Sequence, residues 1–275
     1  MSRLHFYKMS GSGNDFILVD NRDGILSEER LSSFVVAVCR RKLSVGADGF
    51  ILIEPSNKAD FRWQFFNADG SEAEMCGNGG RCAARFAYLR GIASSPLSFE
   101  TRAGVIHAEI MGERVKLEMP PPKDIQVDYR LDIDGTALEV SSINTGVPHV
   151  VVWASELEDV PVLKLGRAIR YHERYMPAGT NVDFVRVQEE GALEIRTYER
   201  GVEEETLACG TGAVAAAIIA VAKGLSSPPI TVYTRSGESL VVHFAGSHSS
   251  FNDVYLEGDA RVIYEGKLWD EGLYY

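Results

Sequence analysis

Short apolar runs alternate along the chain with polar, glycine-rich turns, a pattern typical of a protein built from many short strands. The first part of the sequence predicts strands at 3–9, 15–20, 49–53, 61–66, 97–101, 104–110 and 114–119. The second part predicts strands at 149–153, 183–188 and 193–198, with more up to about residue 267. Helices are few, so the pattern predicts an α+β fold.

Three segments are predicted as helices. The first is 27–40, beginning at Ser27 as N-cap with acidic residues in its first turn. The second begins at 76–80 and ends before Gly91, and the third is 210–223. Because Ala213 to Ala222 is apolar on every side of a helix, we expect this helix to be buried all round by a curled sheet.

The chain matches itself when it is shifted by 133 residues. Cys76 then falls on Cys209, and Thr101-Arg102-Ala103-Gly104 falls on Thr234-Arg235-Ser236-Gly237. Glycines at 13, 46, 77, 79, 91 and 104 fall on glycines at 146, 179, 210, 212, 224 and 237. These matches predict an internal duplication: two pseudo-symmetric domains, each a curled mixed, largely antiparallel sheet around a central helix, with the active site in the cleft between them.

Pro120-Pro121-Pro122 interrupts both helix and sheet and marks the predicted domain boundary. The sequence therefore predicts an N-terminal domain over 1–118 and a C-terminal domain over 119–259. A last strand within 260–275 is expected to return to the N-terminal domain.

Composition narrows the class of function. Across 275 residues, 39 acidic against 28 basic side chains give a net charge of −11, which argues against binding nucleic acid. No apolar run approaches the roughly 20 residues that span a membrane, and residues 1–13 lack the apolar region of a signal peptide. Four cysteines are too few for a disulfide scaffold, so a cytoplasmic protein is expected.

Cys76 and Cys209 are the candidate catalytic residues because each precedes a Gly-x-Gly loop that opens a helix. A helix start favours a thiolate and can bind a carboxylate through its N–H groups. Two such thiols facing one small acid would remove a proton from one side of the α-carbon and deliver one to the other. The alternative is that both are inert core thiols, as predicted for Cys39 and Cys82, which have no matched partner.

Other chemistries lack their motifs. The sequence contains no zinc-ligand spacing, P-loop or Gly-x-Ser-x-Gly elbow, so no metal site is predicted. His149 lies in a loop and is a further candidate for lining the site, while 203–205 is interpreted as an exposed acidic turn.

Taken together, the motifs resemble those of diaminopimelate epimerase. They are Gly13-Asn-Asp-Phe16, Gly46-Ala-Asp-Gly49, Phe66-Asn-Ala-Asp-Gly-Ser71, Met75-Cys-Gly-Asn-Gly-Gly-Arg81, Gly179-Thr-Asn-Val-Asp-Phe184, Tyr198-Glu-Arg-Gly201 and Ala208-Cys-Gly-Thr-Gly-Ala213. The resemblance implies an isomerase that needs no cofactor, pyridoxal phosphate included. It would interconvert LL- and meso-2,6-diaminopimelate in lysine and peptidoglycan-precursor biosynthesis.

By the same resemblance, Cys76 and Cys209 form the acid/base pair. Gly77, Asn78, Gly210 and Thr211 would hold the reacting carboxylate, and Asn14, Asn67, Asn181, Glu199 and Arg200 would hold the remaining amino and carboxylate groups. Many family members carry Asn-Pro-His where this chain has Val147-Pro148-His149, and Asn144 or Thr145 is expected to substitute. Gly49 stands where some members have Gln.

Three alternatives remain open. A proline or hydroxyproline racemase of the same fold would not need Glu199 and Arg200 for a distal amino acid. An isomerase of this fold without the cysteine pair would not need Cys76 and Cys209. A thiol redox protein or small-ligand binder belongs to another class, but redox exchange commonly uses Cys-x-x-Cys, which is absent. The sequence leaves open whether the chain forms a homodimer.

Overall fold

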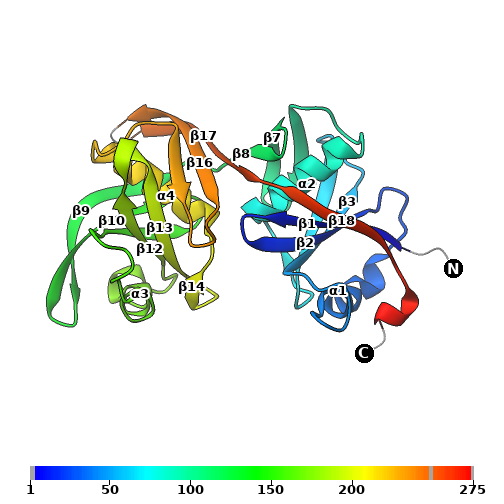
Figure 1. The fold of residues 1–275 in the computed structure, drawn as a ribbon, viewed down its shortest axis with the longest axis horizontal. Helices are drawn as coiled ribbons and strands as arrows, with labels where there is room; N and C mark the ends of the chain where they lie inside the picture. Colours follow the sequence, from blue (N-terminus) through cyan, green and yellow to red (C-terminus); the bar gives the residue numbers. More distant parts are fainter. Residues whose placement is uncertain (1–3, 248–249, 274–275) are drawn as a thin grey trace. The chain divides into compact units, whose positions relative to one another are not determined.

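The computed structural model describes residues 4–247 and 250–273, and the chain divides into two compact units. The first unit holds the chain through Leu117 together with the segment from Gly258 onward, and the second unit is Glu118–Glu257. Strands β8 (Arg114–Glu118) and β17 (Ser250–Asp259) carry the chain across these boundaries (Figure 1). No helix in the described part of the chain is both long and apolar enough to cross a membrane.

The first unit is a mixed sheet with two α-helices. Its strands besides β8 are β1 (Leu4–Gly11), β2 (Asn14–Asp20), β3 (Gly49–Glu54), β4 (Phe61–Asn67), β5 (Glu72–Ala73), β6 (Leu97–Thr101), β7 (Gly104–Met111) and β18 (Arg261–Leu268). Its helices are α1 (Leu31–Cys39) and α2 (Gly77–Leu89), with 3-10 turns η1 (Glu28–Arg30) and η4 (Asp270–Leu273). Strand β18 pairs antiparallel with β1.

The second unit repeats this plan. Its strands besides β17 are β9 (Lys123–Ile133), β10 (Thr136–Asn144), β11 (Pro148–Trp153), β12 (Asn181–Val187), β13 (Leu193–Glu199), β14 (Glu204–Thr206), β15 (Ile230–Tyr233) and β16 (Ser239–Ser247). Its helices are α3 (Val162–Arg170) and α4 (Gly210–Ala222), with 3-10 turns η2 (Glu173–Tyr175) and η3 (Glu189–Gly191).

Strand pairing confirms the predicted duplication. β2 and β3 are parallel in the first unit, as β11 and β12 are in the second. The next pair is antiparallel in both units, β3 with β4 and β12 with β13. A parallel step then follows in each, β4 to β6 and β13 to β15. Helices α2 and α4 both have 13 residues and begin 133 positions apart.

Central strands are buried on both faces, which explains their unbroken apolar runs. Phe16 and Leu18 of β2 pack in the cluster around α2, whereas Ile17 and Val19 pack in the cluster around α1. The second unit has the same two layers, one around α4 and one around α3. Each unit therefore has a helix on either face of its central strands.

Helix α4 lies at the centre of its unit, against β10, β12, β13 and β16 (Figure 1). Every side chain from Ala213 to Ala220 is fully buried, and Val221 and Ala222 are partly buried at its end. The expectation of a helix buried all round is thus confirmed over 213–220. This packing holds the start of the helix, at Cys209, in a fixed place.

One predicted feature needs correction, and some elements were not predicted. The helix expected at 27–40 begins as a 3-10 turn, and α1 starts only at Leu31, after an Arg30 cap without a side-chain bond. Burial decides the start, because Leu31, Val35 and Val38 form the apolar stripe. Helix α3 and the β9–β10 hairpin are absent from the elements predicted above.

Candidate functional site

Cys76 is the N-cap residue of α2 in the first unit. Its backbone is extended (φ −144°, ψ 117°) and its Sγ accepts the Gly79 N–H at 3.5 Å, in the manner of a capping side chain. The thiol is half-buried and forms no disulfide. Gly77 opens the helix with open space around its Cα, since a Cβ built there would meet nothing within 4 Å. A small ligand can therefore approach these first N–H groups.

Cys209 occupies the same position on α4 in the second unit. Its backbone is also extended (φ −124°, ψ 110°), but the residue is buried and its Sγ lies 3.5 Å from Thr211 Oγ1. Burial raises the pKa of the Cys209 thiol, with Glu199 and Asp183 adding to the rise; Thr211 and the Gly212 N–H oppose it. At Cys209, burial and the two carboxyl groups therefore outweigh the effect of the helix start on the thiol pKa. This is contrary to the sequence argument that a helix start favours a thiolate.

A network of buried polar side chains reaches Cys209 through Thr211. His149 Nδ1 lies 2.7 Å from Asp183 Oδ2, and His149 Nε2 lies 2.9 Å from Thr211 Oγ1. Thr197 donates to the other Asp183 oxygen at 2.7 Å. Since a carboxylate accepts, His149 carries a proton on Nδ1 and turns Nε2 towards Thr211. The structure brings predicted residues His149, Thr211 and Cys209 together.

Asn181, Glu199 and Arg200 form a second group in the same unit. Asn181 is buried, and its Oδ1 accepts the Arg200 backbone N–H at 2.8 Å. Arg200 is half-buried and donates from Nη1 to Ala178 O at 3.0 Å. Burial raises the pKa of the Glu199 carboxyl, while Thr206 and His149 lower it. Asn181 therefore fixes the backbone that carries the two charged side chains.

Asn14 and Asn78 meet in the first unit. Asn78 is the second residue of α2, and its Nδ2 donates to Asn14 Oδ1 at 2.8 Å. Asn14 begins β2, and its own Nδ2 donates to Asp48 Oδ2 at 3.0 Å. Arg81, fully buried one turn along α2, donates to Asn78 Oδ1 at 2.7 Å. These contacts tie the start of the helix to β2.

Other predicted residues serve local turns. Asn67 is exposed at the end of β4 and donates to Ser71 Oγ at 3.0 Å. Asn144 Oδ1 accepts the Gly146 N–H at 3.0 Å, as expected of an Asn in a turn. Thr145 is buried and its hydroxyl donates to Thr211 O at 3.0 Å, next to the start of α4. Gly210 has Leu256 as its near neighbour.

Sequence reasoning missed three polar residues that hold the predicted ones. Asp183, Asp48 and Arg81 all lie inside the motifs quoted above, in Gly179–Phe184, Gly46–Gly49 and Met75–Arg81 respectively. Their presence in those motifs was the available signal. The sequence could not give the partners of Asp183 and Asp48, because their contacts to His149, Thr197 and Asn14 join residues on different elements.

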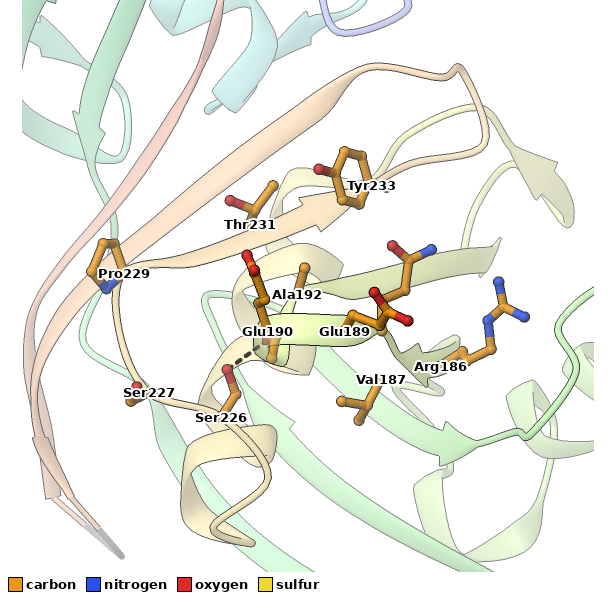
Figure 2. A pocket seen from close by; sticks show the side chains of 12 residues that line it. Arg186, Val187, Glu189, Glu190, Ala192, Ser226, Ser227, Pro229, Thr231 and Tyr233 are labelled. Atoms are coloured by element: carbon orange, nitrogen blue, oxygen red, sulfur yellow. Dashed lines mark hydrogen bonds between the residues drawn. The ribbon is translucent and has the colours of Figure 1, made fainter.

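A separate hollow of about 610 Å³ lies in the second unit, around η3 and β15 (Figure 2). It is lined by Arg186, Glu189, Glu190 and Tyr233 among others, and Ser226 closes one side through a bond to Gly191 O at 2.6 Å. None of its lining residues is a predicted site residue. Arg186 is already paired with Glu194. This hollow is therefore no part of the cysteine-bearing site.

Solved structures of other proteins have the same fold. A Bacillus anthracis phenazine biosynthesis protein of the PhzF family superposes with a TM-score of 0.72 at 16% identity, covering 98% of this chain and 100% of that one. A probable proline racemase from Agrobacterium radiobacter K84 gives 0.69 at 14% identity, covering 97% and 93%. The duplicated α+β fold is thus shared with these two proteins.

Sequence comparison identifies the family. The diaminopimelate epimerase family matches residues 6–124 and 141–263. The diaminopimelate epimerase of Aquifex aeolicus is 50% identical over 283 aligned positions, covering 99% of this chain and 100% of the relative. That of Archaeoglobus fulgidus is 42% identical, covering 97% and 96%. The chain belongs to the diaminopimelate epimerase family.

Proposed function

We propose that this protein interconverts LL- and meso-2,6-diaminopimelate by proton transfer at the α-carbon, as a step of lysine and peptidoglycan-precursor biosynthesis. Membership of the family supports the substrate. The observation that carries the mechanism is the pair of cysteines, Cys76 and Cys209, each the N-cap of the duplicated helix in its own unit. Nothing in this chemistry calls for pyridoxal phosphate or a metal.

In this mechanism one thiolate removes the α-proton and the other cysteine, as a thiol, delivers a proton to the opposite face. The buried surroundings of Cys209 favour its thiol form, so Cys209 is the donor when Cys76 is the base. The first N–H groups of α2 and α4, at Gly77, Asn78, Gly210 and Thr211, stabilise the charge that develops on the carboxylate. The two cysteines exchange roles in the reverse direction.

The distal amino acid needs partners of both charges. Arg200 provides a guanidinium for its carboxylate, and Glu199 provides a carboxyl for its ammonium group. Asn14, Asn67 and Asn181 supply amides that donate and accept. Asn181 also holds the Arg200 backbone, which gives it a positioning role. A proline racemase would have no use for Glu199 and Arg200 as a distal pair.

A cytoplasmic location and a homodimer remain predictions. A biosynthetic enzyme acting on a small metabolite is expected in the cytoplasm. For a dimer, the supporting feature is the exposed apolar side chains of strand β18, at Val262, Ile263 and Tyr264. Light scattering during gel filtration measures the mass, and a mass equal to one chain at micromolar concentration would contradict the dimer.

The test of the function uses purified protein and LL-diaminopimelate in heavy water, without pyridoxal phosphate and with a chelator present. We expect meso product carrying deuterium at the α-carbon. Cys76→Ala and Cys209→Ala should each lose at least about 10²-fold of this activity, the range for a missing acid or base. Cys39→Ala is the matched control, because it removes a buried thiol outside the proposed mechanism.

Three results would contradict the proposal. Turnover of proline alone would move the chain to the racemases of the same fold. Retained activity in either catalytic variant would refute the two-cysteine mechanism. Activity that appears only when pyridoxal phosphate is added would refute cofactor independence.

A further inference from the structure

Four side chains of the first unit form one continuous row of hydrogen bonds. Arg81 Nη2 donates to Asn78 Oδ1 at 2.7 Å, Asn78 Nδ2 donates to Asn14 Oδ1 at 2.8 Å, and Asn14 Nδ2 donates to Asp48 Oδ2 at 3.0 Å. The row runs from helix α2 across β2 to the loop before β3. It contains Asn14 and Asn78, two of the four asparagines that the proposed function places at the substrate.

The two ends of the row fix its direction. A guanidinium only donates, and an ionised carboxylate only accepts. Asp48 has acceptor contacts throughout: its carboxyl oxygens also take the Asp15 backbone N–H at 3.2 Å and Arg41 Nη2 at 2.8 Å. The oxygen and nitrogen of a carboxamide have nearly the same shape, so an isolated Asn can sit either way round. Between Arg81 and Asp48, each Asn has one orientation that satisfies its neighbours.

That orientation decides what the asparagines can offer a ligand. Each carboxamide uses one N–H and one lone pair for hydrogen bonds within the row. The other N–H and the other lone pair therefore remain on fixed sides of the carboxamide. Asn78 stands beside Gly77 at the start of α2, two residues after Cys76. A reversed Asn78 would exchange the sides on which its remaining N–H and its remaining lone pair face a ligand.

We propose that Asp48 is a positioning residue that sets the direction of the Asn14 and Asn78 carboxamides, and through them the recognition of substrate at the start of α2. This inference rests on the proposed function, because that function assigns the two asparagines to the substrate. Asp48 acts through Asn14 rather than on the reacting atoms.

Arg41 provides a matched comparison. Its side chain is exposed and binds both Asp15 and Asp48, so it belongs to the same ion pairs but not to the row. Asp15 is also held by the buried Lys8. Arg41→Met removes a charge partner of Asp48 and leaves the row with its donor and acceptor ends.

The test compares Asp48→Asn with Arg41→Met. An amide at position 48 has the shape of the carboxylate but can donate as well as accept, so the row loses its fixed end. We expect Asp48→Asn to raise KM for diaminopimelate by about 10- to 100-fold, the effect of a lost charge-assisted hydrogen bond, with a smaller change in kcat. Arg41→Met should keep KM within about twofold.

Nuclear magnetic resonance adds a readout that a purely structural role would not move. In the wild-type protein, one side-chain N–H of Asn14 and one of Asn78 should be protected from exchange with solvent. Asp48→Asn should remove that protection while the backbone amides of β2 keep theirs. If Asp48→Asn does not fold, the wild-type measurement still decides, because rapid exchange of all four side-chain protons would overturn the inference.

The outcomes separate the inference from the proposed function. Unchanged KM and kcat in a folded Asp48→Asn would overturn the positioning role, and so would equal impairment in Arg41→Met, which would assign the effect to the ion pairs. A wild-type protein without diaminopimelate turnover would refute the function, and the exchange data would then test the direction of the row by themselves.

Discussion

Gly212, in the first turn of α4, has a neighbour that leaves no room for a side chain. A Cβ built on it would lie 2.4 Å from Asp183 Oδ1, about 1 Å inside normal contact. Asp183 cannot retreat easily, because it is fully buried and bonded to Thr197 and His149. Gly212→Ala should therefore displace either the start of α4 or the carboxylate that holds His149.

The cost can be worked from these contacts. Overpacking a core typically costs about 1–3 kcal/mol, and weakening hydrogen bonds to a charged group adds about 1.5–3 kcal/mol. Replacing Gly by Ala inside a helix returns about 1 kcal/mol. The net expectation for Gly212→Ala is a loss of about 1.5–5 kcal/mol in the free energy of unfolding of the second unit.

The duplication supplies the control at Gly79, which holds the same place on α2. Its added Cβ would approach Ile51 Cδ1 at 3.3 Å and Trp63 at 3.4 Å. The first of these is the end of a flexible side chain and can shift slightly. Gly79→Ala is therefore expected to change stability by no more than about 1 kcal/mol, because the helix gain offsets the crowding.

Urea unfolding followed by circular dichroism measures both variants, and hydrogen exchange of peptides from α2 and α4 assigns each change to its unit. Gly212→Ala should lower the midpoint and the protection of α4, with Gly79→Ala close to wild type. Equal stability of the two variants would refute the reasoning, since it would mean that Asp183 moves freely despite its burial and its bonds.

Three further predictions concern charge and thiol chemistry. Burial raises the pKa of Cys39 and Cys82 to about 12. Iodoacetamide at pH 8 should therefore label Cys76 in the native protein and label Cys39 and Cys82 only after unfolding. Peptide mass spectrometry identifies the labelled cysteines, and labelling of Cys82 in the native protein would contradict this prediction. Burial raises the pKa of Asp15, but Arg41 and Lys8 outweigh it and lower the pKa to about 2. Asp15→Asn should therefore be less stable than the wild type near neutral pH, and the difference should disappear as pH falls from about 4 towards 2. A difference in stability that persists at pH 2 would contradict this prediction. Burial raises the pKa of Glu199, so ionising this carboxyl should cost the folded wild type stability as pH rises above about 4.5. Glu199→Gln lacks that cost, so its urea midpoint should rise relative to the wild type between pH 4 and pH 7. A constant difference over this range would refute the assignment.

A local pattern in the sequence was sufficient to predict several elements, but one such pattern was missed. The wholly apolar run of α4 indicated a helix buried on all sides, and the matched glycines indicated two copies of one plan. The β9–β10 hairpin was missed although Ile125, Val127, Tyr129 and Leu131 alternate with polar residues over β9, a visible period of two.

Helix α3 was missed although Val162, Leu165 and Ile169 have the spacing of one helix face. Gly166 lies in its middle, where an isolated glycine lowers the expectation of a helix. The structure supplies the reason for that glycine: a Cβ there would lie 2.5 Å from the Cβ of Tyr198 on β13. Close packing of helix on strand requires the residue that weakens the local signal, and that requirement is visible only in the folded unit.

The residues of the candidate site likewise fall into those that the sequence predicted and those that it did not. The cysteines and the asparagines followed from motifs, while the groups that hold them depend on tertiary contacts. The pKa of the Cys209 thiol could not be predicted from the sequence either. A helix start predicts a lowered pKa, whereas burial at Cys209 raises it.

Duplication gives the two units equivalent cysteines, yet the surroundings of those cysteines differ in kind. Cys76 is half-buried, is capped by an N–H, and has a row of neutral amides near the same helix start. Cys209 is buried, with the carboxyl groups of Glu199 and Asp183 raising its pKa. Proton transfer across the α-carbon needs one thiolate and one thiol at the same moment, and the buried surroundings of Cys209 favour the thiol there. The two helix starts have therefore diverged in their polar surroundings: in the second unit Asp183 is fully buried beside His149, whereas in the first unit Asp48 is paired with the exposed Arg41.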